Sequence, residues 1–511
     1  MPKFDEKKFI PFLIFLHLAA ALPLAYFVNI WADEASTLYT TQNGFPYALQ
    51  NAFSIEKQAP LYFWVLSLWR GLDDSVFFAR LFSIIISALA IVFFFRLARK
   101  FFDKNAAVFA TAFFALHPYL FWASLEIRLY SSVILFSILI LYLFTENFLN
   151  SRDVKPQIDK EILFIFVSIV ALYTNYYLGF LLVGCFVALP VLRKWTEAKK
   201  YFLNMLVVGL FFLPLLWAMK AQFAVNSSDF QTEKSLFEGL RLIWHHFLTF
   251  VLPTEIFPPQ TISLISFFRL WLVRLAILTA IVLLIKTRKI FDEKILAFGA
   301  ISATIVFFLL AAYFLLGGRY IAIRHAAVLF VPVIFLVSIV LKEILPQKIN
   351  DKFFSKFNYL ISFSFIVLIA LFFAYSIYTL YPNLTKRGDW ARIAAFIEAH
   401  EKPDQPIIIF PNYDALALPV YYKGANKILP DENFFAWSAE AEPGTSESTK
   451  KQMEFIISEI PSDAKEIWLL TDESCEITER CRPLENFVEA NYNIVESKMF
   501  YLEKLRLLRK K

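Results

Sequence analysis

Long apolar runs separated by short clusters of charged residues dominate the first three quarters of the chain. A helix needs about 20 apolar residues to cross the hydrocarbon core of a bilayer. On this criterion the pattern predicts eleven membrane spans, over residues 9–31, 77–98, 104–122, 129–148, 161–175, 177–193, 201–220, 263–286, 294–316, 325–342 and 358–380. The apolar segment 60–72 is too short to cross alone, so we expect it to lie in the interface or to re-enter the membrane.

The pattern changes after residue 380 to alternating helix and strand signals. Helices are expected over 389–400, 413–422 and 450–460, and strands over 406–410, 466–471, 491–497 and 499–508. Alternating elements of this kind are typical of a small α/β layer. The sequence therefore predicts a mostly α fold, with a polytopic transmembrane domain over 1–380 and an α/β domain over 381–511.

Composition restricts the function classes further. Apolar residues make up 58% of the chain and the mean hydropathy is +0.56, which excludes a soluble enzyme, a disordered chain and a fibrous protein. Residues 1–380 carry 33 Lys and Arg against 22 Asp and Glu, so the positive charge belongs to the membrane part. The basic character of the chain therefore does not indicate a nucleic-acid partner, and membrane lipids are the expected surroundings.

The placement of Lys and Arg predicts the orientation, because cytoplasmic loops carry an excess of both. If the N-terminus is cytoplasmic, the inner segments hold 22 of these residues and the outer loops before residue 380 hold 8. Eleven spans then place residues 381–511 on the extracytoplasmic side. The expected location is the plasma or inner membrane.

Two cysteines add a small argument about the second domain. Cys475 and Cys481 are separated by five residues, and an extracytoplasmic compartment permits a disulfide. Two free thiols are the alternative at this point, and a zinc site is disfavoured because no His or further Cys lies near the pair.

The first outer loop opens with two adjacent carboxylates, Asp33 and Glu34, directly after the first span. Ionisable groups at the membrane mark a functional site by default, so this pair is a candidate for acid–base chemistry. The plainer interpretation is a solvated helix end, with Asp33 capping a helix over 34–42.

Three further polar clusters lie at the same predicted face. The first cluster contains Lys57, Gln58 and Tyr62, the second contains Glu126, Arg128 and Tyr130, and the third contains Arg319, Tyr320 and Arg324. Glu126 and Arg128 can form a structural ion pair instead of a site, because buried charges tend to be paired. The basic groups of the third cluster can extend to the interface without binding an anion.

Taken in order, these clusters resemble the GT-C glycosyltransferases. An acidic pair after the first span, a Pro-Leu-Tyr element, Glu-x-Arg-x-Tyr after the third span and Arg-Tyr before a late span are similar to family 39, the protein O-mannosyltransferases and aminoarabinose transferases. The resemblance covers roughly residues 1–345. It implies a GT-C fold and transfer of a sugar from a polyprenyl-phosphate donor, with inversion, at the outer membrane face.

The resemblance also implies roles for the residues that match. Asp33 is the expected base for the acceptor proton, and Glu34 supports it. Glu126, Arg128 and Tyr130 are expected to line the same cavity. The late cluster, Arg319, Tyr320 and Arg324, is expected to hold the departing lipid phosphate.

One departure affects the donor site. The family usually has His or Lys followed by Pro-Pro before Leu-Tyr, whereas this chain has Gln58 and Ala59. Lys57, Gln58 and Tyr62 are carried over as substrate-binding residues, but Gln58 cannot supply charge to a phosphate. Whether Lys57 replaces it is open.

Other activities remain as alternatives. A transporter or flippase of a lipid-linked sugar is disfavoured because such proteins tend to break helices with Gly and Pro around a midplane site, and this chain has only 12 Gly. A scaffold with an exported binding domain is a third class. The acceptor hydroxyl can belong to a protein, a lipid or a glycan, and the acidic residues form no clear ligand set, so a divalent metal is left open.

Overall fold

The computed structural model describes residues 6–149, 158–226, 235–253, 264–286, 291–316, 321–344, 367–431, 434, 454–472, 475 and 481–511. Contacts within the chain divide it into two compact units. The first, called here the helical unit, comprises residues 1–26, 58–220 and 233–380. The second, called here the mixed unit, comprises residues 27–57, 221–232 and 381–511. Residues 27–57, the first part of the loop that follows the first span and is called the first outer loop after its predicted side, thus belong to the same unit as the C-terminal α/β domain.

Helices coincide with the predicted spans as far as the structure describes them, which for the last span, 358–380, begins at residue 367. They are α1 (Glu6–Phe27), α5 (Val76–Phe101), α6 (Lys104–Ala115) with α7 (Pro118–Ser124), α8 (Tyr130–Phe144) with the π-helical turn η1 (Thr145–Leu149), α9 (Ile158–Thr174), α10 (Leu178–Val191), α11 (Trp195–Asn226), α13 (Leu264–Lys286), α14 (Glu293–Leu316), α15 (Ala327–Ile344) and the segment Val367–Leu384. Among the described residues six helices are long and apolar enough to cross a membrane alone, and the bent pair α6–α7 makes a seventh if it is one span. The chain is a multi-pass membrane protein, and the total of eleven spans stays a prediction.

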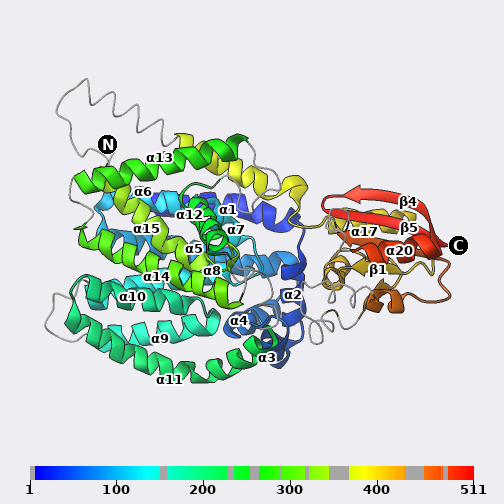
Figure 1. Cartoon of the computed structure of the whole chain (residues 1–511), viewed down its shortest axis with the longest axis horizontal. Helices are drawn as coiled ribbons and strands as arrows, with labels where there is room; N and C mark the ends of the chain where they lie inside the picture. Colours follow the sequence, from blue (N-terminus) through cyan, green and yellow to red (C-terminus); the bar gives the residue numbers. More distant parts are fainter. Residues whose placement is uncertain are drawn as a thin grey trace. The chain divides into compact units, whose positions relative to one another are not determined.

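The helical unit also contains α4 (Leu61–Arg70), over the segment judged too short to cross, and α12 (Leu236–Val251), which the sequence did not predict as a separate element. Its helices pack lengthwise in a bundle, with α10 along α14 and α5 along α8 (Figure 1). Gly184 lets α10 approach α14 closely, because a Cβ there would lie 3.1 Å from the Ile301 carbonyl oxygen. Small residues at such contacts are how membrane helices gain packing without a hydrophobic driving force.

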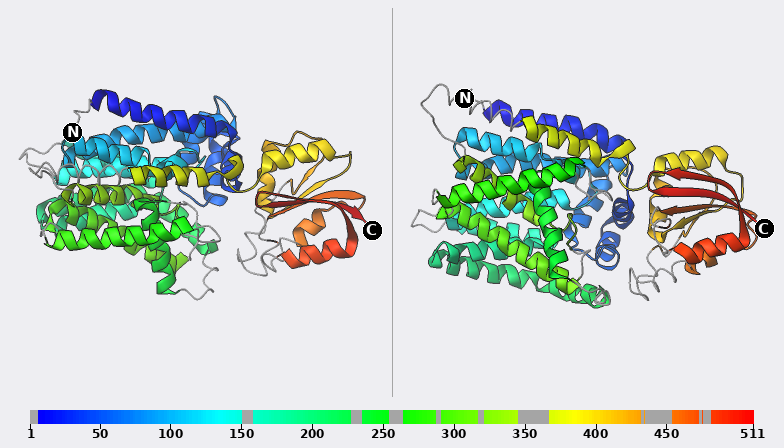
Figure 2. Two further views of the ribbon diagram at one scale, coloured as in Figure 1. Left: turned by 90° about the horizontal axis from the view of Figure 1, so that it is seen from above. Right: turned by 45° about the horizontal axis from the view of Figure 1, so that its top comes forward.

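A five-stranded sheet forms the centre of the C-terminal part of the mixed unit, in the order β2-β1-β3-β5-β4. Its strands are β1 (Ile407–Phe410), β2 (Ile428–Leu429), β3 (Glu466–Asp472), β4 (Tyr492–Phe500) and β5 (Glu503–Lys510). β1 pairs in parallel with β2 and β3, whereas β5 is antiparallel to β3 and β4. Helices α17 (Trp390–His400) and α20 (Arg482–Asn491) cover opposite faces (Figure 2), which explains why every residue of β1 is buried.

Several predictions for this part need correction. Residues 413–422 form no α-helix; two 3₁₀ turns, η6 (Asn412–Leu416) and η7 (Leu418–Val420), stand there, because Pro419 has no amide hydrogen and disfavours a helical residue before it. Helix α20 was not predicted. The last strand begins at Glu503 instead of residue 499, since the hairpin turn lies at Tyr501 and Leu502.

The predicted bridge between Cys475 and Cys481 is present, with their Cα atoms 4.9 Å apart. Both cysteines belong to the core beneath α20, together with Leu484 and Val488. The bridge therefore fixes the start of α20 to the sheet.

Candidate functional site

The predicted carboxylate pair lies in the first turn of α2 (Ala32–Thr41), in the mixed unit. The N-cap residue is Trp31, which makes no side-chain capping bond, so Asp33 is not the cap that the plainer interpretation expected. Acidic residues in a first turn are favourable because the amino end of a helix carries partial positive charge.

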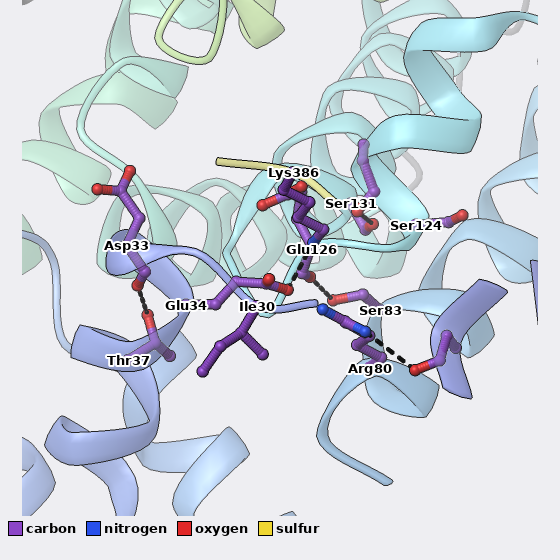
Figure 3. Close-up of polar contacts among 12 residues, drawn as sticks. Ile30, Asp33, Glu34, Thr37, Arg80, Ser83, Ser124, Glu126, Ser131 and Lys386 are labelled. Atoms are coloured by element: carbon purple, nitrogen blue, oxygen red, sulfur yellow. Dashed lines mark hydrogen bonds and ion pairs between the residues drawn. The ribbon is translucent and has the colours of Figure 1, made fainter. Parts of the chain in front are cut away.

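Glu34 is held in a buried ion pair. Its Oε1 lies 2.7 Å from Nζ of Lys386, and the two side chains are 0% and 5% exposed (Figure 3). Removing one partner of a buried pair typically destabilises a protein by about 3–5 kcal/mol, because the other charge is left without compensation. Glu34 is thus held by Lys386, a partner that lies 352 residues away in the chain and has no signal in the sequence.

Asp33 differs from its neighbour. It is half-buried, its carbonyl oxygen accepts a hydrogen bond from Thr37 Oγ1 at 3.1 Å, and its carboxylate points away from that of Glu34 (Figure 3). Of the two adjacent acids, Asp33 is therefore the one that is partly exposed to solvent, whereas Glu34 is fully buried.

A group of acidic residues in the mixed unit was missed by the sequence analysis. Asp414 lies in η6, shortly after the carboxyl end of β1, Asp472 is the last residue of β3, and Glu503 pairs with Asp472 in the sheet register. Burial, and then the charges of Asp472 and Asp33, raise the pKa of Asp414 well above its ordinary value. Burial, and then Asp414, Asp472 and Asp389, do the same to the pKa of Glu503. The signal for this group was the position of each acid at a strand end.

Glu56 is a further polar residue near Asp33 and Glu34 in the sequence-derived loop that was not predicted as part of the site. Its Oε1 accepts hydrogen bonds from Ser36 at 3.0 Å and from Thr40 at 3.4 Å, which ties the end of the first outer loop to α2. Lys57 follows with a positive φ of 51°, a conformation that is uncommon for a residue with a side chain. Lys57 and Gln58 are both half-buried.

In the helical unit, Tyr62 is buried in the first turn of α4, and its ring centroid lies 6.0 Å from that of Phe82. It thereby joins α4 to α5. A common role for Lys57, Gln58 and Tyr62 stays a proposal.

The Glu-x-Arg-x-Tyr element forms the buried turn between α7 and α8. Glu126, Arg128 and Tyr130 are 1%, 6% and 4% exposed. Ser83 on α5 donates a hydrogen bond to the Glu126 carbonyl oxygen at 2.7 Å. The Trp122 and Tyr130 rings stack with their centroids 4.9 Å apart. Non-helical backbone inside a membrane domain is tolerated only where protein buries it or where it lines a cavity. In this turn the surrounding helices bury the backbone.

Arg80 adds a charge that the sequence analysis treated only as part of a span. It lies near the start of α5, is fully buried, and donates from a guanidinium nitrogen to the Ala25 carbonyl oxygen at 3.0 Å (Figure 3). A single Arg inside an apolar run was the available signal, because ionisable groups in such runs are expensive to bury.

The late cluster is only partly described, since Arg319 and Tyr320 lie outside the described residues. Arg324 is half-buried in a turn whose backbone is fixed on both sides. Tyr119 donates its hydroxyl to the Ile323 carbonyl oxygen at 3.0 Å, and the His325 ring stacks on Tyr177 at 5.5 Å. The turn is therefore held by α7 and by the segment before α10.

The predicted residues divide between the two units. The mixed unit contains Asp33, Glu34 and Lys57, and the helical unit contains Gln58, Tyr62, Glu126, Arg128, Tyr130 and Arg324. Within the described ranges no group of three or more His, Cys, Asp or Glu side chains is arranged to hold a metal ion.

Comparison with known proteins is informative at this point. Residues 57–217 match the model of the dolichyl-phosphate-mannose-protein mannosyltransferase family, which is less than half of the chain. The matched range contains Lys57, Gln58, Tyr62 and the Glu126–Tyr130 element. No curated protein sequence matches the chain significantly.

Solved structures extend the similarity to the whole length. ArnT from Cupriavidus metallidurans bound to undecaprenyl phosphate is similar with a TM-score of 0.56 and 14% identity, over 98% of each chain. Its apo state gives a TM-score of 0.54 at 14% identity, over 97% of this chain and 98% of that one. The Archaeoglobus fulgidus oligosaccharyltransferase, tethered with an acceptor peptide, is similar with a TM-score of 0.55 and 13% identity. The similarity covers 96% of this chain and 72% of that one. The chain therefore has the GT-C fold of these membrane proteins along its whole length, and its residues 57–217 also match a mannosyltransferase family model.

Proposed function

We propose that this protein transfers a sugar from a polyprenyl-phosphate donor to an acceptor hydroxyl at the extracytoplasmic membrane face, with inversion at the anomeric carbon. The observation that carries the proposal is the half-buried carboxylate of Asp33 on the first turn of α2, in a fold shared along the whole chain with a protein solved with undecaprenyl phosphate. A lipid donor is also consistent with the absence of a Gly-rich nucleotide loop from the sequence.

In the proposed reaction Asp33 accepts the proton of the acceptor hydroxyl. The acceptor oxygen forms a bond to the anomeric carbon while the bond between that carbon and the phosphate oxygen breaks. A single displacement of this kind inverts the configuration, and polyprenyl phosphate leaves with the bonding electrons. Fixed cations stabilise the charge that develops on the phosphate. Arg319 and Arg324, with Tyr320 in the same cluster, are the candidates for that role, and Glu126, Arg128 and Tyr130 are the candidates for lining the same cavity.

The reaction makes a direct prediction about products. When the purified protein is given a sugar-linked polyprenyl phosphate and an acceptor, we expect the donor to disappear and free polyprenyl phosphate to accumulate. Thin-layer or mass-spectrometric analysis of the lipid fraction measures both, and NMR of the anomeric proton reports the configuration of the product. Uptake of a lipid-linked sugar in proteoliposomes without release of polyprenyl phosphate would favour the transporter or flippase instead.

We further propose that the N-terminus is cytoplasmic and that residues 381–511 are extracytoplasmic, on the strength of the Lys and Arg distribution. The disulfide provides the test. With Cys185 replaced, we expect an impermeant maleimide to label intact cells only after an impermeant reductant opens the Cys475–Cys481 bridge. Labelling that requires permeabilised membranes would place the domain on the cytoplasmic side.

A further inference from the structure

The start of the first outer loop is joined to the segment by which the chain enters the α/β domain. Asn29 donates its backbone N–H to the Leu384 carbonyl oxygen at 3.0 Å, and its side-chain oxygen accepts from the Ala391 N–H at 3.3 Å. The Asn29 side chain also donates to the Asp389 carboxylate at 3.4 Å. The junction further includes a hydrogen bond from the Ile30 N–H to the Tyr421 hydroxyl at 2.8 Å, and the Arg387 guanidinium lies over the Trp31 ring, 5.4 Å from its centroid. Residues 29–34 are therefore part of the mixed unit through specific polar contacts.

Lys386 occupies a fixed position in this junction. It precedes a turn at Gly388, whose φ of +93° is rarely adopted by residues with a side chain. A Cβ at Gly388 would also lie 2.7 Å from the Trp390 ring. The backbone next to Lys386 is thus constrained, and its ammonium group is directed to Glu34 in a setting where neither side chain is exposed to solvent beyond 5%.

The ion pair between Lys386 and Glu34 affects the position of Asp33, because Asp33 precedes Glu34 in the same helical turn. Both acids are in the first turn of α2, which has no side-chain cap, so the orientation of that turn depends on its tertiary contacts. Successive helical residues point in directions about 100° apart. A rotation of the turn that releases Glu34 must therefore move the Asp33 carboxylate as well.

We propose that Lys386 is a positioning residue for sugar transfer. By holding Glu34 it fixes the first turn of α2, and with that turn the direction of the Asp33 carboxylate. The inference rests on the proposed function in assigning the base role to Asp33. It gives the α/β domain a part in the reaction, since the residue that orients the loop comes from the domain's first segment.

A double-mutant cycle tests whether Lys386 acts through Glu34. We expect Lys386→Met and Glu34→Gln each to lower kcat about 10²-fold with little change in the donor KM, because a small misplacement of a reacting group costs about that factor. The variant carrying both changes should be no slower than the slower single variant, and Lys386→Arg should recover most of the rate. A double variant whose loss equals the product of the two single losses would overturn the inference, because Lys386 would then act on the substrates independently.

A second readout needs no donor or acceptor. Hydrogen exchange of the full-length protein should show faster exchange of the Ala32–Thr41 amides in Lys386→Met than in wild type, with unchanged exchange in β3. Lys427→Met is the matched control, since it removes one charge of an exposed pair with Asp431 in the same unit, and it should change neither readout. Wild-type exchange of α2 in Lys386→Met would overturn the inference. If wild type transfers no sugar, the proposed function fails while the exchange result still judges the role of Lys386 in holding α2.

Discussion

Replacing Asp33 by Asn is expected to remove most of the sugar transfer while leaving the protein folded. The amide has nearly the shape of the carboxylate but cannot accept the proton of the acceptor hydroxyl. General base catalysis typically contributes about 10²–10⁴-fold, so we expect kcat to fall by at least about 10²-fold. The initial rate of polyprenyl phosphate release by the purified variant measures the loss.

The structure supplies a control for the charge change itself. Asp431 is an exposed acid of the same unit and forms a surface ion pair with Lys427, so Asp431→Asn should retain the wild-type rate. Normal folding of Asp33→Asn is checked by the elution volume of the detergent complex and by hydrogen exchange in β3. Near-wild-type transfer by a normally folded Asp33→Asn variant would remove Asp33 from the mechanism.

The spans and the core strands were predictable because their signals are local. Apolar runs such as 77–98 and 294–316 coincide with α5 and α14, and the apolar segments 406–410 and 466–471 became β1 and β3. Helix α20 was missed because its amphipathic pattern is short and is interrupted by polar residues, and its place over the sheet depends on the disulfide and on Leu484 and Val488.

The site was less predictable because its contacts are distant in sequence. Asp33 and Glu34 look equivalent in the sequence, and only the contact with Lys386 separates a buried structural acid from a half-buried one. Arg80 is hidden in the pattern of an ordinary span, although the structure buries its guanidinium completely. Asp414 and Asp472 come together through the parallel pairing of β1 with β3, and Glu503 joins them through the antiparallel pairing of β5 with β3, which residue spacing does not reveal.

Buried carboxyl groups make the stability of the sheet depend on pH. The pKa values of Asp414 and Glu503 are raised in the folded protein, first by burial and then by neighbouring acids. In the unfolded chain such groups titrate at about pH 4, so above that pH the folded state binds more protons than the unfolded state. The contribution of protonated Asp414 and Glu503 to the free energy of unfolding is fully present below about pH 4. It is lost as the pH rises through their raised folded-state pKa values.

We therefore expect the opening free energy of β3 and β5 to decrease as the pH is raised from about 5 to about 9, a range above the ordinary carboxyl pKa values. Each unit by which a folded-state pKa exceeds its unfolded value contributes about 1.4 kcal/mol to this decrease. Asp414→Asn is neutral at every pH, so the decrease should be smaller in that variant, and smaller still when Glu503→Gln is added. Native-state hydrogen exchange of the full-length protein measures the opening free energy at each pH, after correction for the intrinsic exchange rate.

The pH dependence, and not the absolute stability, carries this prediction. Asn at position 414 removes the titration but also changes a buried contact, which shifts the opening free energy by the same amount at every pH. Glu489→Gln is the matched control, because Glu489 is an exposed acid on α20 and its removal should leave the pH dependence as in wild type. An Asp414→Asn variant whose opening free energy decreases with pH as steeply as that of wild type would show that Asp414 is ionised throughout the range. A cation or a compensating basic group would then have to neutralise the acids at the ends of β1 and β3, and the carboxyl group would hold no proton in the folded domain.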